Sequence, residues 1–431
     1  MTNVNDYRGL TDSEIIENAL AALDTDRTLL IPPRAQENEP ERDWWLIDRA
    51  ILLDSDTTVV MRNSKIKLSD SARDNFFRSA NCGFGFDDNE LFTNIHIRGE
   101  GLCVLEGADH PRATGDGTKI LANPCPKTVE DLKKYADWIP EETRKTGKDW
   151  SFWYEHSHSL GTDAGKEGES QYGDWRGVGI LFAMVDRFSI EGLRIVDSHG
   201  WGISCEACTN GRIEKIDFDA TMARMIDGML QNSENQDGID LRNGCHDIII
   251  SDITGRTGDD IVALTAIARG DKIHPGGALR TTHVMHNDWS RRDRDIHDVI
   301  IRNVLGYSGG GLCFHVRLLP VESKIYNIVI DGVVDSSPEG FTDGGAILLG
   351  EGDGGYGVNL SDGMKNITIS NVISKSRNCI IVAGYLKDSV ITNVVNRNPD
   401  CPPFRIHREN GMVNVLTSNI FSAEKEDLHK T

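Results

Sequence analysis

Three aspartates that could perform acid–base chemistry stand in two short, similar stretches of the sequence. Asp237 lies within Asn235–Leu241, and Asp259 and Asp260 lie within Thr257–Leu264. Each stretch joins an acidic turn to an aliphatic run, and a strand-like segment separates the two. Asp237 and Asp260 are 23 residues apart, about one coil of a solenoid repeat. Because stacked strands lie ~4.8 Å apart, we predict that the three carboxylates converge on one outer face.

Clustered carboxylates of this kind have three interpretations, and residue types alone leave all three open. Glycoside hydrolysis needs a carboxylic acid for the leaving oxygen and a carboxylate that activates water; inversion needs the two carboxyl groups roughly 6.5–9.5 Å apart. Close like charges raise one pKa, which supplies the acid. Calcium binding also uses clustered aspartates. In the third interpretation, Asp-Gly and Gly-Asp-Asp only shape turns.

The elements that position these aspartates are expected to be short parallel strands. A strand of the form aliphatic-x-aliphatic-x-small/polar-aliphatic recurs between residues 94 and 394. Its spacing varies, which indicates bare coils and coils with insertions, and no helical crossover pattern of a doubly wound sheet appears between 188 and 396. We predict an all-β fold, a right-handed parallel β-helix that forms one domain over residues 1–431. The small or polar position of this pattern, near the middle of each strand, marks the repeat. It falls at Gly192, Lys215, Asp252, Asn303, Gly332, Asn371 and Asn393.

The two ends of the solenoid are expected to be capped. Residues 1–30 are predicted to form the N-terminal cap, with an amphipathic helix over 10–23 that Thr11 and Glu14 begin as a capping box. The repeat fades after Asn396, so residues 397–431 are predicted to be a C-terminal cap and polar tail. Capping is required because a solenoid exposes hydrophobic core at both ends.

Two insertions are predicted to rise beside the aspartates, because function on repeat folds concentrates where insertions project. Residues 106–176 are rich in aromatic side chains, among them Trp153, which either stack on sugars or form a core of the loop itself. Residues 267–298 hold a basic cluster that includes Arg280, Arg291 and Arg292. These cations either bind an anionic substrate or pair within the loop.

Composition excludes several classes of partner. The formal net charge is −21, so a nucleic-acid or anionic-membrane partner is not expected, since both need a basic surface. No signal peptide and no membrane-spanning run is visible. The nine scattered cysteines indicate reduced thiols and a cytoplasmic protein, with secretion left open. Cys205 and Cys208 form a lone Cys-x-x-Cys without a second pair, so no metal and no cofactor is predicted.

From about Trp175 to Val316 the chain resembles the polygalacturonase family, glycoside hydrolase family 28, within the pectin-lyase-like superfamily. Asp197-Ser-His-Gly-Trp201 is similar to that family's Asn-Ser-x-x-Trp motif. Asn235-Gln-Asp237-Gly resembles Asn-Thr-Asp-Gly, and Gly258-Asp259-Asp260 resembles Gly-Asp-Asp. The resemblance implies that Asp259 is the general acid and that Asp237 and Asp260 position and activate water.

Two motifs of that family are missing. The histidine of its Gly-His-Gly motif falls at Gly310, with His315 five residues on as a spatial substitute. Its Arg-Ile-Lys motif, which binds a galacturonate carboxylate, falls in 345–350, where this sequence has no cation. Arg317 and the basic loop are the alternative sources of positive charge for binding such a carboxylate. The candidate substrate contacts are Trp153, Trp201, Asn235, Arg280, Arg291, Arg292, His315 and Arg317.

These patterns favour an inverting glycoside hydrolase that acts on an oligo- or polysaccharide. One alternative is a carbohydrate-binding β-helix protein that has lost catalysis, as the missing histidine suggests. Another is a polysaccharide lyase or glycan-rearranging transferase of the same fold, which needs a Lys, Arg or Tyr base and often calcium. The sugar, its linkage, and self-association into a homo-oligomer are left open.

Overall fold

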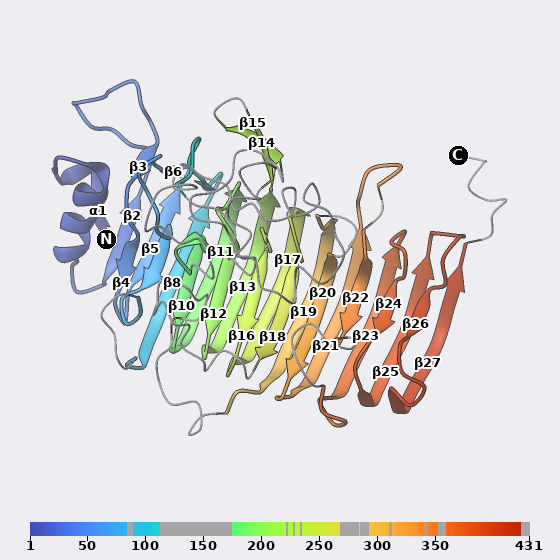
Figure 1. Ribbon diagram of the computed structural model, residues 1–431. Coiled ribbons are helices and arrows are strands. Elements are labelled where there is room, and N and C mark those ends of the chain that lie inside the picture. Colours follow the sequence, from blue (N-terminus) through green and yellow to red (C-terminus); the bar gives the residue numbers. More distant parts are fainter. Residues whose placement is uncertain are drawn as a thin grey trace, which may run out of the picture.

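The structure is a computed structural model that describes residues 1–83, 89–112, 175–220, 235–267, 284, 293–309, 313–341, 343–351 and 359–423, with the backbone of 223–226 and 229–232. Two long sheets run side by side along one axis, and the chain passes from one sheet to the other in each coil (Figure 1). Apart from one hairpin, the strand pairs of the described residues are parallel. The predicted right-handed parallel β-helix is therefore confirmed.

The sheet that carries the aspartates has ten strands in the described part of the chain. Their order is β26-β24-β22-β20-β18-β16-β12-β10-β7-β4, so each strand pairs with those of the preceding and following coils. The bounds are β4 (Ile51–Leu53), β7 (Phe77–Ser79), β10 (Ile180–Ala183), β12 (Ile203–Glu206), β16 (Ile239–Arg242), β18 (Val262–Ile267), β20 (Phe314–Val321), β22 (Gly345–Leu349), β24 (Ile380–Val382) and β26 (Phe404–Ile406).

The larger sheet forms the remaining wall. Its main path is β1-β2-β5-β8-β11-β13-β17-β19-β21-β23-β25-β27, with β3, β6 and β9 beside it. The bounds are β1 (Thr2–Asn3), β2 (Thr28–Ile31), β3 (Trp45–Ile47), β5 (Thr58–Arg62), β6 (Lys65–Leu68), β8 (Phe92–Glu100), β9 (Val104–Glu106), β11 (Val185–Val196), β13 (Thr209–Asp219), β17 (His246–Arg256), β19 (Ile296–Tyr307), β21 (Ile325–Asp335), β23 (Met364–Ser374), β25 (Leu386–Asn396) and β27 (Met412–Ser422). The hairpin pairs β14 (Ala223–Ile226) with β15 (Met229–Asn232), and two short 3₁₀ helices span Val4–Asp6 and Trp175–Gly177.

The long strands of the larger sheet bend at residues in the left-handed conformation. Every predicted repeat marker has a positive φ, from 55° at Asn393 to 77° at Gly332. Asparagine, aspartate and glycine tolerate this conformation better than other residues. The marker therefore recurs because each coil needs a residue that can turn there, and Lys215, with φ 57°, is the exception among the seven.

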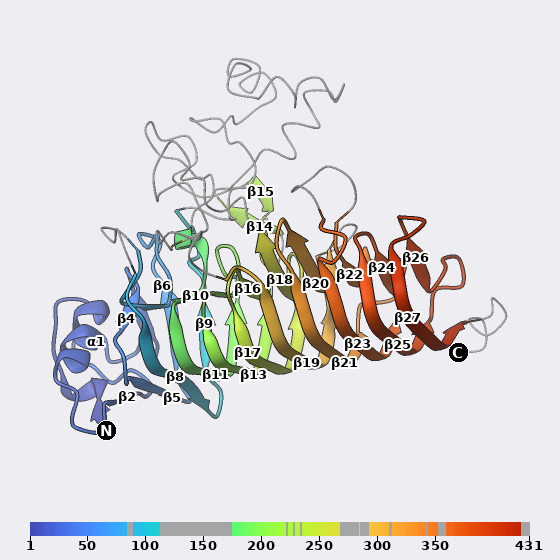
Figure 2. The same ribbon diagram turned by 90° about the horizontal axis from the view of Figure 1, so that it is seen from below.

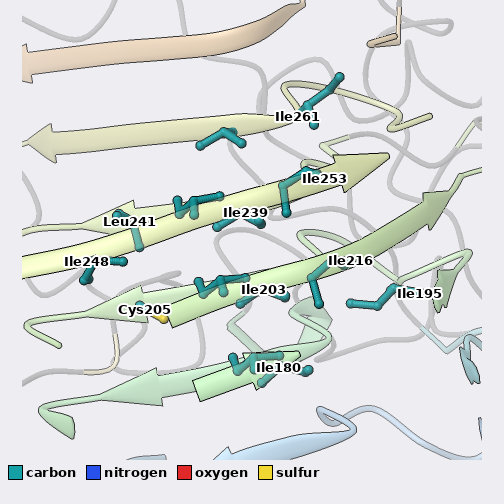
Figure 3. Close-up of a cluster of buried hydrophobic side chains, with 14 of the residues drawn as sticks. Ile180, Ile195, Ile203, Cys205, Ile216, Ile239, Leu241, Ile248, Ile253 and Ile261 are labelled. Carbon is teal, nitrogen blue, oxygen red and sulfur yellow. The ribbon is translucent and has the colours of Figure 1, made fainter. Parts of the chain in front are cut away.

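Aliphatic ladders fill the space between the two sheets. Ile180, Ile203, Ile239 and Val262 occupy equivalent positions on successive coils and all point inward. Figure 3 shows the first three stacked on neighbouring strands. Burying a branched aliphatic side chain contributes about 1.5–3 kcal/mol, so one continuous core holds the coils in register.

The N-terminal cap forms as expected, and the helix α1 runs from Asp12 to Ala21. The Thr11 hydroxyl accepts from the Glu14 amide at 3.3 Å, and the Glu14 carboxylate accepts from the Leu10 amide at 2.7 Å. Ile16 of the helix lies in the core, and Figure 2 shows α1 over the first coil. No helix in the described ranges is long and apolar enough to span a membrane.

The solenoid extends further than the sequence predicted. The repeat does not end at Asn396, because β26 pairs with β24 and β27 pairs with β25 in the same parallel register. The pattern is harder to recognise there because this last coil packs against the core on one side only. Val413, Leu416 and Phe421 of β27 are consequently more than half exposed.

Lys215→Asn is expected to stabilise the fold. A lysine in the left-handed conformation is strained by up to about 1–2 kcal/mol, and asparagine relieves part of this. The midpoint of urea unfolding should rise for Lys215→Asn, while the reverse change Asn303→Lys on a later coil should lower it. An unchanged midpoint in both variants would contradict the role assigned to these bends.

Candidate active site

The three aspartates lie together at the start of two neighbouring strands. Asp237 precedes β16, and Asp259 and Asp260 precede β18; one carboxylate oxygen from each lies within 4.8 Å of the others. The Gly238 amide donates to the Asp260 carbonyl at 2.8 Å, so the two turns stack coil on coil. Asp237 and Asp260 are buried and Asp259 is half-buried. The predicted convergence on one face is confirmed.

A break in side-chain alternation makes Asp237 and Asp260 point outward. A Cβ on Gly238 would meet the Phe218 ring at 2.9 Å, so this position faces the core, as does Ile239 next to it. Two successive residues therefore face the core at the start of the strand: Gly238 and Ile239 on one coil, and Ile261 and Val262 on the next. The residue before each pair, Asp237 or Asp260, is directed to the outer surface.

Asp260 is held by donors from the following coil. The Phe314 amide donates to Asp260 Oδ1 at 2.6 Å, and Arg317 Nη1 lies 3.4 Å from Oδ2. Burial raises the pKa of Asp260 to about 7; Arg317 opposes the shift and the charge of Asp259 adds to it. Asp260 therefore keeps a proton close to neutral pH.

The carboxylates are closer than the inverting geometry led us to expect. Their nearest oxygens lie within 4.8 Å, against roughly 6.5–9.5 Å between carboxyl groups in inverting enzymes. The cause is the register, since residues at equivalent positions on adjacent coils stand ~4.8 Å apart. Asp260 therefore does not titrate independently of its neighbours, because the charge of Asp259 contributes to its raised pKa.

Trp201 and Asn235, which we predicted to contact substrate, lie in turns next to Asp237. Trp201 sits one coil before Asp237, whose carbonyl accepts from the Gly202 amide at 2.8 Å. Trp201 is 8 % exposed, and the Arg242 guanidinium lies over its indole ring, 4.8 Å from the ring centre. Trp201 thus forms a wall of the site rather than an exposed stacking platform. Asn235, half-buried with φ 53°, begins the turn that presents Asp237.

His315 is not at this site, which corrects the expectation that it contacts substrate. It occupies the inward position that Ile261 occupies one coil earlier, and its side chain has no exposed surface. Its Nε2 lies 2.9 Å from the Gly306 carbonyl oxygen inside the coil. The neighbouring residue Phe314 faces outward, and its amide binds Asp260 on that side. His315 is the next residue along the chain and faces inward, so its side chain lies on the opposite side of the backbone from Asp260.

Arg317 is the cation that the structure places beside the aspartates. Its β20 position pairs with Ala263 of β18, and its side chain is one-fifth exposed. The following strand β22 contains no cation, as its sequence indicates. Trp153, Arg280, Arg291, Arg292 and Gly310 lie outside the described residues.

Each predicted insertion contributes a described residue to an apolar cluster on this outer face. Trp175, from the end of the first insertion, packs in one apolar cluster with Trp201 and Leu181. Val284, from the second, belongs to the same cluster, and its amide donates to Glu206 Oε2 at 3.0 Å. These two contacts lie on the side of the coil that carries the aspartates.

Sequence reasoning missed three charged residues on the same face. Glu206 of β12 and Asp240 and Arg242 of β16 are almost completely buried. They alternate with the inward residues Ile239 and Leu241, and this period of two was the signal that could have found them. They place two carboxylates and one guanidinium on the outward side of the same sheet.

The comparisons with solved structures show similarity to carbohydrate-active β-helix proteins. A mutant tailspike protein of Escherichia coli bacteriophage HK620, in complex with a pentasaccharide, has a TM-score of 0.51 and 10 % identity, over 97 % of this chain and 65 % of that one. The Yersinia enterocolitica family 28 exopolygalacturonase has a TM-score of 0.44 and 12 % identity, over 97 % and 78 %. The Azotobacter vinelandii mannuronan C-5 epimerase A-module has 0.42 and 10 %, over 98 % and 95 %.

No protein-family model and no curated protein sequence matches this chain. The likeness to the tailspike protein, at 10 % identity and a TM-score of 0.51, bears on the fold alone and does not identify a reaction.

The proton held by Asp260 predicts a particular dependence of stability on pH. Its pKa is above that of an unfolded aspartate, so unfolding releases a proton between about pH 4 and 7 and native stability falls as pH rises. The melting temperature of wild type minus that of Asp260→Asn should therefore decrease from pH 5 to pH 8. For Asp362→Asn, whose parent carboxyl has its pKa lowered by Lys324, the difference should stay flat because neither group of that pair titrates between pH 5 and 8. A flat difference for Asp260→Asn would contradict the raised pKa.

Proposed function

We propose that this protein is a glycoside hydrolase that cleaves an oligo- or polysaccharide at Asp237, Asp259 and Asp260. The observation that carries the proposal is the cluster itself: three carboxylates within 4.8 Å, one with a pKa of about 7. Such a cluster holds a proton and a negative charge together at neutral pH. General acid–base cleavage of a glycosidic bond needs both.

In the proposed reaction, Asp259 and Asp260 share one proton. Asp259, the more accessible of the two, donates it to the glycosidic oxygen as the bond from that oxygen to the anomeric carbon breaks. Water attacks the anomeric carbon and gives a proton to Asp237 or to the ionised Asp260. The products are two sugars with new hydroxyl groups, and the pair regains its proton from the base or solvent.

The donors around Asp260 support this assignment of roles. The Phe314 amide and the Arg317 guanidinium both bind its carboxylate, which holds the buried group in one orientation. Arg317 also stabilises the ionised form, so Asp260 can pass its proton to Asp259, on the more exposed side, during the reaction. A buried acid without such partners would simply stay protonated.

The substrate class follows from the same face. Two carboxylates beyond the triad and the net charge of −21 disfavour a densely charged polyanion. Two guanidiniums lie on this face, but Arg242 is buried over Trp201 and Arg317 is engaged by Asp260. We therefore propose a neutral or sparsely charged glycan rather than polygalacturonate.

Each aspartate should be required for turnover. Asp259→Asn should keep the fold and reduce the rate at least about 10²-fold, the usual contribution of a general acid. Asp237→Asn and Asp260→Asn should also cripple turnover, and the losses should not add because the residues act as one unit. A reducing-sugar assay across a panel of neutral and acidic glycans measures this. The matched control is Asp252→Asn on the opposite sheet, where asparagine suits the left-handed backbone.

Product analysis separates this proposal from its rivals. Proton NMR of the first product should show the inverted anomer, whereas a retained anomer would assign one aspartate as a nucleophile and contradict the direct attack by water. An unsaturated, absorbing product would assign a lyase. Saturable glycan binding with no cleavage by wild type would assign a binding protein. Full activity of Asp259→Asn would return these aspartates to a turn-forming role.

A further inference from the structure

A second group of titratable side chains meets inside the coil, away from the aspartate cluster. His315 of β20, Asp335 at the end of β21 and Asp343 just before β22 each place one donor atom within 4.8 Å of the others. None of the three side chains is more than 3 % exposed. This internal group comes from two consecutive coils and has no part in the reaction proposed above.

The imidazole of His315 is oriented as a metal ligand is. The Gly306 carbonyl oxygen can only accept, so the Nε2 at 2.9 Å carries a proton and donates it. Nδ1 then faces Asp343, 3.5 Å from its Oδ2. Metal-binding histidines commonly donate their other N–H to a backbone carbonyl or carboxylate in this way. In the described part of the chain, neither His315 Nδ1 nor Asp343 Oδ1 has a hydrogen-bond partner.

The two aspartates are fixed by other contacts. Asp335 accepts from the Ser337 amide at 2.9 Å and the Lys375 amide at 3.0 Å. The Ser308 hydroxyl donates to Asp343 Oδ2 at 3.2 Å. These donors hold both carboxylates beside the His315 ring, with Asp335 Oδ1 4.0 Å from Nε2 and Asp343 Oδ2 3.5 Å from Nδ1.

Charge balance favours a cation between these three side chains. With both carboxyl groups ionised and the imidazole neutral, the group carries a charge of −2 in the coil interior, where an uncompensated charge costs several kcal/mol. Burial accordingly raises the pKa of Asp343. Among the described residues, Asp335 and Asp343 form ion pairs with His315 only. A protonated His315 would still leave one negative charge, whereas a divalent ion neutralises the group.

We propose that His315, Asp335 and Asp343 bind one divalent transition-metal ion inside the coil, and that Zn²⁺ fits best. Imidazole with carboxylates is a donor set that zinc prefers, while calcium takes six or more oxygen ligands. Zinc bonds of 2.0–2.1 Å set tetrahedral ligands about 3.4 Å apart, close to the 3.5 Å between His315 Nδ1 and Asp343 Oδ2. The Ser308 hydroxyl is the available fourth donor. This assignment replaces the expectation that the chain binds no metal.

The ion would support the outer site through the backbone. His315 directly follows Phe314, whose amide donates to Asp260 Oδ1 at 2.6 Å. A ligand that fixes His315 on the inside also fixes that amide on the outside. His315 is therefore a positioning residue, and its loss should change stability and metal content before it changes chemistry.

Metal analysis of the wild-type chain tests the proposal directly. Protein purified without chelator and dialysed should contain about one zinc per chain by inductively coupled plasma mass spectrometry. Because the site is enclosed, a chelator should remove the ion only after unfolding. Protein refolded with Zn²⁺ should then melt at a higher temperature than protein refolded with chelator, since an ion bound only by the native state stabilises it.

Variants identify which group holds the ion. Asp343→Asn and His315→Gln should lose the zinc, whereas the double variant Asp237→Asn with Asp259→Asn should retain it. Loss of zinc from the outer double variant together with retention in Asp343→Asn would assign the ion to the outer aspartates and overturn the proposal. Wild type without bound metal, and with equal melting temperatures after both refolding procedures, would overturn it as well. Neither result depends on glycan cleavage.

Discussion

The register between successive coils is the constraint on which the rest of this structure depends. Residues at equivalent positions on neighbouring coils stand ~4.8 Å apart, so the fold converts a sequence spacing into a contact. The 23 residues from Asp237 to Asp260 are one such coil. The same register stacks Ile239 on Val262 inside and Asp240 beside Ala263 outside. Core and candidate site are therefore produced by one geometric rule.

That rule explains why much of the fold could be predicted from sequence. A bend that needs a left-handed residue leaves asparagine, aspartate or glycine at a recurring position, and every predicted marker has a positive φ. The aspartate cluster could be predicted for the same reason, because its residues lie in two turns one coil apart. The last coil could not, since β27 has core on one side only and its exposed aliphatics blur the pattern.

The direction of single side chains was harder to predict, and His315 shows why. Strand alternation would place His315 and Arg317 on the same side of β20, since they are two residues apart. At the start of each strand, however, two successive residues face the core, as Gly238 and Ile239 do. His315 occupies the first of these positions and Val316 the second, so His315 is inside while Arg317 is outside. This break depends on the backbone of the turn, which residue types alone do not specify.

The same break in alternation links the outer aspartate cluster to the inner histidine group through two adjacent residues. Phe314 and His315 are adjacent, but the Phe314 amide binds the outer Asp260 and the His315 ring joins the inner Asp335 and Asp343. Burial raises the pKa of Asp260, and the amide and Arg317 limit that rise, so the proton affinity of this carboxyl depends on where β20 begins. Whatever fixes His315 on the inside also fixes that starting point. The stability of the inner group and the acidity of the outer one are then linked through a single turn, with no contact between their side chains required.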